Sequence, residues 1–242
     1  MAESFAWGLL AASSLVIGAV VALLFRLRND VIGLIMAFGA GVLISAVAFD
    51  LVEEAMGSTS GHGSIIFGLL AGCLVFFGGD LIIDRLGGGD RKDSGGAQAD
   101  GSALAIVLGT VLDGIPESAV IGLTIYKGGA VGAAYLVAVF ISNLPESISS
   151  TAGLAASWAR SRILWMWTGI AVISGLASLA GYKLFQHASG DVVAFVLAFA
   201  AGAILTMLAD TMIPEAYENG GKLVGVVTTL GFCLALTIHE LS

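Results

Sequence analysis

The stretch MAFGAGVLISAVAFDLVEEA at residues 36–55 decides the fold, because it returns as LAFAAGAILTMLADTMIPEA at residues 197–216. The two copies align without gaps at a constant offset of 161 residues, counted from 36 to 197. Identical residues include the acids near the two C-terminal ends, Glu54 and Glu215. Each copy is long and apolar enough for a membrane-spanning helix, which takes about 20 residues. A repeat of this kind predicts a polytopic membrane protein built from duplicated halves.

The composition of the whole chain agrees with this interpretation. Of the 242 residues, 57% are hydrophobic and 12% are charged, whereas a soluble domain has about 25% charged residues. So little charge excludes an ordinary soluble domain, and so many apolar residues exclude a disordered chain. Two cysteines are too few for a disulfide scaffold. No stretch is basic enough to bind nucleic acid, so we expect no nucleic-acid partner.

Apolar runs as long as a bilayer is thick predict eight transmembrane helices in a single transmembrane domain, residues 1–242. The predicted spans cover residues 5–25, 31–52, 63–83, 103–126, 131–156, 162–184, 191–214 and 222–240. The N-terminus lacks the basic flank and cleavage site of a signal peptide, so we expect the first span to remain in the mature protein. The Gly-, Ser- and Asp-rich stretch at 87–102 predicts a cytoplasmic linker.

The basic residues predict the orientation, because Lys and Arg gather on the cytoplasmic side of a membrane. Only Lys127 and Lys183 follow even-numbered spans. The other eight follow odd-numbered spans and are Arg26, Arg28, Arg85, Arg91, Lys92, Arg160, Arg162 and Lys222. We therefore expect an integral protein of the plasma (inner) membrane with both termini outside. The second span then runs outward and the seventh inward, so the two copies of the repeat are inverted.

A second, shorter repeat lies in the fourth and fifth spans. LDGIPES at 112–118 and SNLPES at 142–147 share Pro-Glu-Ser at an offset of 29, counted from Pro116 to Pro145. The two repeats together predict the fold class. It is an all-α polytopic membrane protein with eight transmembrane helices in a 3+2+3 arrangement with inverted repeats.

Polar side chains in these two central spans share helix faces. Asp113 and Glu117 are four residues apart, and Asn143 and Glu146 are three apart, with Ser142 adding a hydroxyl. Neither span contains Lys or Arg, so carboxylates in the bilayer need a bound cation or a proton. Carboxylate and amide oxygens suit divalent cations, which predicts a metal site between the two spans. The alternative is protonated carboxyls that hydrogen-bond the helices together.

Each central span also contains a proline. Pro116 removes the backbone hydrogen bond to the carbonyl of Leu112, and Pro145 removes the one to the carbonyl of Ile141. We expect the prolines to break the helices, and the freed carbonyls to help hold an ion.

Further acids lie at the ends of the repeat spans. Asp210 and Glu215 lie along the seventh span towards the cytoplasm, and Asp50 closes the second span near the outer face. One interpretation makes them stations on a cation path, with Asp210 and Glu215 as additional metal-binding residues. The other makes them interfacial acids at helix ends. His239 is expected to take a surface or helix-end role rather than to capture metal.

In these residues the chain resembles the ZIP (zinc/iron permease) family of divalent-metal transporters. The resemblance covers nearly the whole chain and rests on eight spans, a Pro-Glu motif in each central span, and the AFAAGA…IPEA stretch of the seventh. The family's fourth span typically reads His-Asn-x-Pro-Glu-Gly, and its fifth contains a polar pair before Ile-Pro-Glu-Gly. The resemblance implies that these two motifs form the transport site, with Ser142 and Asn143 as the polar pair.

The chain departs from the family pattern at four of these positions. Asp113 replaces the usual His, Gly114 replaces Asn, and Ser118 and Ser147 replace the Gly after each Glu. In the sixth span, where the family often has a Glu-Pro that helps to bind a second metal, this chain has Ser178 and Leu179. Without an imidazole the site favours a harder or larger cation, or a broad selection, and zinc stays among the candidates.

We expect the chain to carry a divalent metal cation such as zinc, iron or manganese into the cytoplasm by alternating access. The metal is then a substrate, and no prosthetic group is expected. One alternative is a proton-coupled carrier of an organic cation, which aromatic residues beside the acids would favour. A weaker alternative is an intramembrane metal-dependent hydrolase, which needs His ligands at depth, so no enzyme is expected. The Gly-rich helix faces allow a homodimer.

Overall fold

Helices make up the regular structure of the residues that the computed structural model describes, which are 2–25, 27–61, 63–88, 103–126 and 133–241. The long helices are α1 (Ala2–Leu24), α2 (Asn29–Ser45), α4 (Gly63–Ile83), α5 (Ala103–Tyr126), α6 (Ala133–Leu154), α7 (Arg160–Leu184), α8 (Gly190–Met207) and α10 (Val224–Leu241). Shorter helical segments are η1 (Ala46–Val52), α3 (Glu53–Ser58), η2 (Asp84–Gly88), η4 (Leu208–Met212), α9 (Ile213–Gly220) and η5 (Gly221–Leu223).

The two copies of the long repeat leave α-helical geometry at the same place. The helix α2 continues into the π-helical turn η1, and α8 continues into the π-helical turn η4. The offset of 161 residues places η1 on positions 207–213, which include the whole of η4. Because π-helical residues are rare in proteins, this coincidence is strong support for a structural duplication.

Close helix packing follows the same repeat. At four glycines a side chain would collide with a carbonyl oxygen of the neighbouring helix. These contacts are Gly41 with Thr228, Gly202 with Leu69, Gly231 with Phe38, and Gly72 with Phe199. The four contacts form two corresponding pairs. An offset of 161 residues takes Phe38 and Gly41 to Phe199 and Gly202. An offset of 159 takes Leu69 and Gly72 to Thr228 and Gly231. The packing of α2 on α10 is therefore repeated by α8 on α4.

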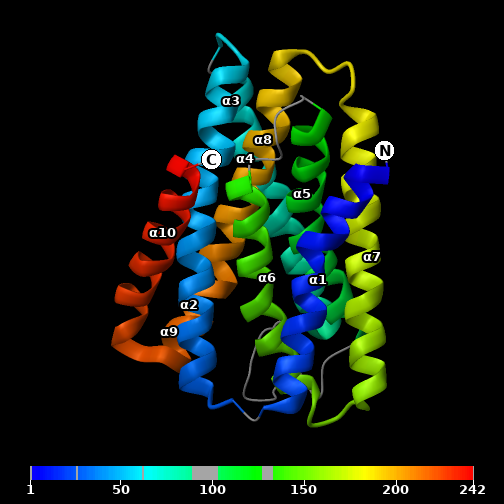
Figure 1. Cartoon of the computed structure of the whole chain (residues 1–242), viewed down its shortest axis with the longest axis vertical. Coiled ribbons are helices and arrows are strands. Elements are labelled where there is room, and N and C mark those ends of the chain that lie inside the picture. The colour runs from blue at the N-terminus through cyan, green and yellow to red at the C-terminus, as the bar shows by residue number, and fades with distance from the viewer. Residues whose placement is uncertain (1, 26, 62, 89–102, 127–132, 242) are drawn as a thin grey trace.

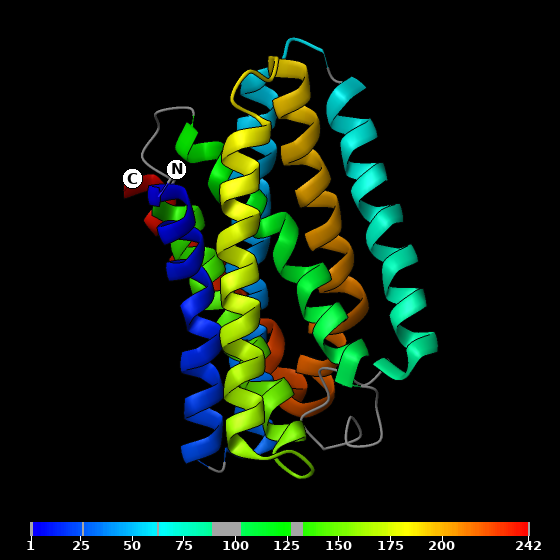
Figure 2. The ribbon, with the colours of Figure 1, turned by 90° about the vertical axis from the view of Figure 1, so that its right-hand side faces the viewer.

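The repeated helices run in opposite directions, as Figures 1 and 2 show. The helix α2 rises towards the end of the bundle where α1 begins and α10 ends, whereas α8 descends from that end. Among the described basic residues, Lys183 belongs to this end. Those at the opposite end are Arg28, Arg85, Arg160, Arg162 and Lys222. Arg26, Arg91, Lys92, Lys127 and most of the expected linker 87–102 (residues 89–102) lie outside the described residues.

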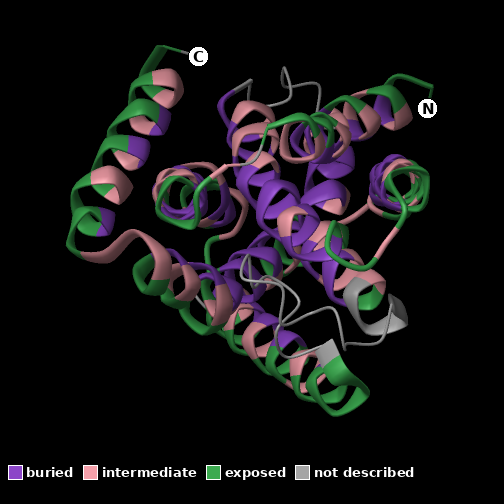
Figure 3. Cartoon of the chain, turned by 90° about the horizontal axis from the view of Figure 1, so that it is seen from below, coloured by how far each residue is buried: buried purple, intermediate pink, exposed green. Residues whose placement is uncertain are grey.

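Six helical stretches within the described residues are long and apolar enough to cross a membrane. The longest, Gly190–Leu241, turns back at Gly221, whose φ of 62° favours glycine. The helix α6 is absent from this set because its middle is rich in polar residues. In the view along the bundle, buried residues lie towards its middle and exposed ones on the outer faces (Figure 3).

Two helices continue beyond the ends of the predicted spans. The second span was expected to end at residue 52, but the chain stays helical to Ser58, with Glu53 and Glu54 exposed in α3. The seventh was expected to end at 214, but α9 continues to Gly220. Acids and a proline favoured an end at both places. The π-helical turns let the helices continue, and Pro214 is tolerated in the first turn of α9.

Candidate metal site between α5 and α6

The acids of α5 lie inside the bundle at mid-helix. Asp113 is 4% exposed and Glu117 is 3% exposed. The helix is held against α7 by close backbone contacts, because side chains at Gly122 and Gly181 would collide with the carbonyl oxygens of Ser178 and Ala119. Both carboxylates are therefore shielded from the outer surface of the bundle.

The polar residues of α6 are buried in the same way. Ser142, Asn143 and Glu146 are each less than 9% exposed. Gly18 of α1 lies against the carbonyl oxygen of Leu144, and Gly39 of α2 lies against the ring of Pro145. Neighbouring helices therefore fix α6 around its Pro-Glu motif, as α7 fixes α5.

The prolines do not break the helices, which corrects the expectation from the sequence. Pro116 lies inside the continuous helix α5 and Pro145 inside the continuous helix α6. A membrane helix tolerates an internal proline where neighbouring helices surround it. Because proline has no N–H, the carbonyls of Leu112 and Ile141 still lack their helical hydrogen bonds. Their oxygens can therefore accept another hydrogen bond or bind a cation.

The five predicted site residues on α5 and α6 are all buried, and the two helices contact each other. No Lys or Arg belongs to either helix. Among the described residues, however, no three His, Cys, Asp or Glu side chains come together as a possible metal site. In this conformation the oxygen donors are thus buried on adjacent helices without a closed cage of acids.

The two additional residues predicted on the seventh span have different surroundings. Glu215 on α9 is half-buried and accepts a hydrogen bond of 3.1 Å from the hydroxyl of Ser149, which lies three residues after Glu146 on α6. Asp210 on η4 is exposed, and its side chain is not part of the buried polar group. The structure therefore connects Glu215, but not Asp210, to the central helices.

A run of buried hydroxyls on α6 was not foreseen from the sequence. Ser149, Ser150 and Thr151 are at most 2% exposed, and Thr151 accepts a hydrogen bond of 2.8 Å from the indole of Trp167. Their position shortly after the Pro-Glu-Ser motif, with only Ile148 between, was the available signal. These hydroxyls extend the polar part of α6 from Glu146 towards the end of the bundle that contains α9.

A second polar pair joins α10 to the first repeat copy. Nδ1 of His239 lies 2.8 Å from Oδ1 of Asp50, and the two side chains are 28% and 12% exposed. Asp50 also lies close enough to Tyr135 of α6 to act electrostatically on its hydroxyl, as Glu117 does from α5. The helix-end role expected for His239 is therefore a specific contact to an acid of the first repeat copy.

No protein-family profile matches this chain. It is similar to a protein of Arabidopsis thaliana. That protein has the name "putative zinc transporter". The two are 26% identical over 205 residues, which is 84% of this chain and 33% of the plant protein. The chain thus spans about one third of the relative's length, and the relative's name agrees with the family resemblance found in the sequence.

Proposed function

We propose that this protein transports a divalent metal cation across a membrane by alternating access. The observation that carries the proposal is the pair of adjacent buried helices α5 and α6, with Asp113, Glu117 and Glu146 each at most 8% exposed and no basic residue on either helix. Carboxylates buried in a bilayer are costly unless a cation or proton neutralises them. A transported cation supplies this charge and accounts for the surrounding amide and hydroxyl oxygens.

The repeat supports alternating access as the mechanism. Two inverted copies with matching π-helical turns and matching glycine contacts can form two related conformations, one open to each side. In this proposal the chain crosses the membrane eight times in a 3+2+3 arrangement. Both termini lie outside a plasma (inner) membrane, and the end with Arg28, Arg85 and Lys222 faces the cytoplasm.

Cation binding would draw the oxygen donors together. Asp113, Glu117, Asn143 and Glu146 are the proposed ligands, with Ser142 beside them, and Glu215 receives the ion on the way out through its link to Ser149. The metal is the substrate and enters the cytoplasm. The name of the plant relative makes zinc the first candidate, while Asp113 in place of the family's His extends the choice to harder ions such as manganese.

Uptake into proteoliposomes that contain a metal-sensitive dye tests the proposal. The purified chain should admit zinc or manganese at a rate that saturates with external metal, and protein-free vesicles should not. Absence of uptake for every divalent ion would contradict metal transport. Tyr135 lies near Glu117, so an organic cation carrier remains the second candidate. Uptake of a radiolabelled organic cation, without uptake of metal, would favour that carrier.

A further inference from the structure

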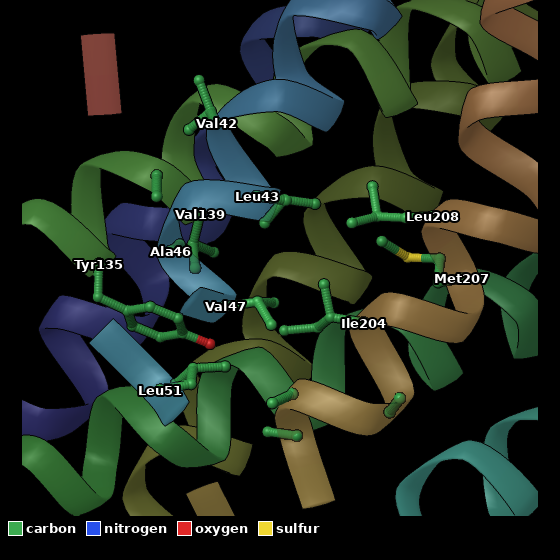
Figure 4. Close-up of a cluster of buried hydrophobic side chains, with 14 of the residues drawn as sticks. Val42, Leu43, Ala46, Val47, Leu51, Tyr135, Val139, Ile204, Met207 and Leu208 are labelled. Atoms are coloured by element: carbon green, nitrogen blue, oxygen red, sulfur yellow. The ribbon is translucent and has the colours of Figure 1, made fainter. Parts of the chain in front are cut away.

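Tyr135 has a buried hydroxyl that its local packing does not use. The side chain is 2% exposed, and its oxygen has no hydrogen-bond partner among the described residues. Figure 4 shows the hydroxyl pointing into a cluster of apolar side chains, towards Leu51 and Val47. Burying a hydroxyl without a partner is unfavourable, so a phenylalanine would suit this conformation better.

The cluster around Tyr135 lies where the two halves of the repeat meet. Three of its residues in the first copy have counterparts in the second at the offset of 161. These pairs are Leu43 with Ile204, Ala46 with Met207, and Val47 with Leu208. The hydroxyl of Tyr135 is the only oxygen on the side chains labelled in Figure 4.

Two carboxylates act electrostatically on this hydroxyl. Both Glu117 of the candidate site and Asp50 are close enough to act on it electrostatically. Asp50 is bound to His239 near the end of α10, at the end of the bundle where α1 begins. Glu117 lies at the middle of α5. The hydroxyl of Tyr135 is thus within electrostatic range of both an acid near that end of the bundle and an acid of the central site.

We propose that Tyr135 is a transit ligand. Its hydroxyl oxygen binds the divalent cation as the ion passes from the Asp50 side to Glu117, when the repeat halves separate. In the present conformation the cluster is closed and the hydroxyl points into it. The proposal rests on the proposed function and adds to it a residue that sets the rate of passage, while the central ligands set the affinity.

The experiment compares Tyr135→Phe with the unchanged chain and with Tyr217→Phe, a matched control on the exposed face of α9. Zinc or manganese uptake into dye-loaded vesicles gives kcat and KM, and thermal unfolding gives Tm. We expect Tyr135→Phe to lower kcat about tenfold. This is the effect of losing one contact, between the hydroxyl oxygen and the cation, that is about as strong as a hydrogen bond. KM and the stoichiometry of metal binding should stay unchanged, and Tm should stay equal or rise. The control should match the unchanged chain.

A kcat for Tyr135→Phe equal to that of the control would overturn this inference, because the hydroxyl would then have no part in passage. A fall in kcat together with a lower Tm would also overturn it, since a structural role would explain both. Failure of the proposed function gives a different result, in which the unchanged chain itself moves no metal.

Discussion

Ser149 on α6 donates a hydrogen bond of 3.1 Å to Glu215 on α9, so the central helix and the second repeat copy are directly connected. Ser149 is fully buried and Glu215 is half-buried. Glu215 is the counterpart of Glu54 at the offset of 161 residues, and Glu54 is exposed in α3. The contact with Ser149 places an acid of the second copy beside the polar run that follows Glu146.

Replacing Ser149 by Ala should therefore slow the release of metal. The change leaves the carboxylate of Glu215 without one donor, which costs about 1–3 kcal/mol when such a group is buried and less when it is half-buried. We expect a lower uptake rate and a slightly lower Tm. Ser13→Ala is the matched control, because the hydroxyl of Ser13 bonds within its own helix, to the carbonyl of Leu10. Equal uptake by both variants would disprove a role for this contact.

Alanine substitutions at the repeat glycines should destabilise the bundle. A methyl group at Gly41 or Gly202 would collide with a backbone carbonyl on the neighbouring helix, so either substitution forces two helices apart. We expect each variant to lose about 1–3 kcal/mol in the free energy of unfolding, the usual cost of overpacking. In Gly169→Ala the new methyl meets open space, and this control should be neutral or more stable by up to about 1 kcal/mol. Wild-type Tm values for both repeat variants would contradict the packing described.

A double-mutant cycle on Asp50 and His239 should show that the two residues are coupled. Their side chains are partly shielded from solvent, so Asp50→Asn and His239→Gln should give a coupling energy of about 1 kcal/mol in chemical denaturation. The same cycle on Arg28 and Asp30, whose side chains are 81% and 49% exposed, should give less than that. A coupling energy near zero for Asp50 and His239 would show that this contact does not hold α10 to the first repeat copy.

Changing Asp113 to His should alter metal selectivity. An imidazole in place of a carboxylate favours zinc over manganese, because nitrogen ligands suit zinc and oxygen ligands suit manganese. In competition uptake with both metals, we expect the ratio of zinc to manganese to rise in Asp113→His. The exposed acid Glu218 offers the control Glu218→His, which should leave the ratio unchanged. A ratio that does not change in Asp113→His would remove Asp113 from the ligand set.

The positions of most helices could be predicted from the sequence. Apolar runs long enough for a membrane helix, and the repeat at an offset of 161 residues, are both visible in it. The π-helical turns η1 and η4 could not be predicted, since no composition signal distinguishes them from α-helix. The expected helix breaks at Pro116 and Pro145 were wrong, because packing by neighbouring helices is a tertiary effect.

The buried acids of the candidate site were also found from the sequence, because i, i+3 and i, i+4 spacing places residues on one helix face. Contacts between distant segments were not. Asp50 and His239 are separated by 189 residues, and Ser149 and Glu215 by 66, so only the packing of whole helices brings each pair together. The unpartnered hydroxyl of Tyr135 depends on the same packing, and the sequence shows it only as one of several aromatic residues.

The most direct test of the central claim is metal uptake by Glu117→Gln and Glu146→Gln in dye-loaded proteoliposomes, beside the exposed control Glu218→Gln. Each central substitution keeps the shape of the side chain and removes one negative charge, so the proposed site loses a ligand charge while the bundle stays folded. We predict that both central variants reconstitute and unfold like the unchanged chain but take up no zinc or manganese, whereas the control transports normally. Normal uptake by both central variants would contradict the assignment of the site to α5 and α6.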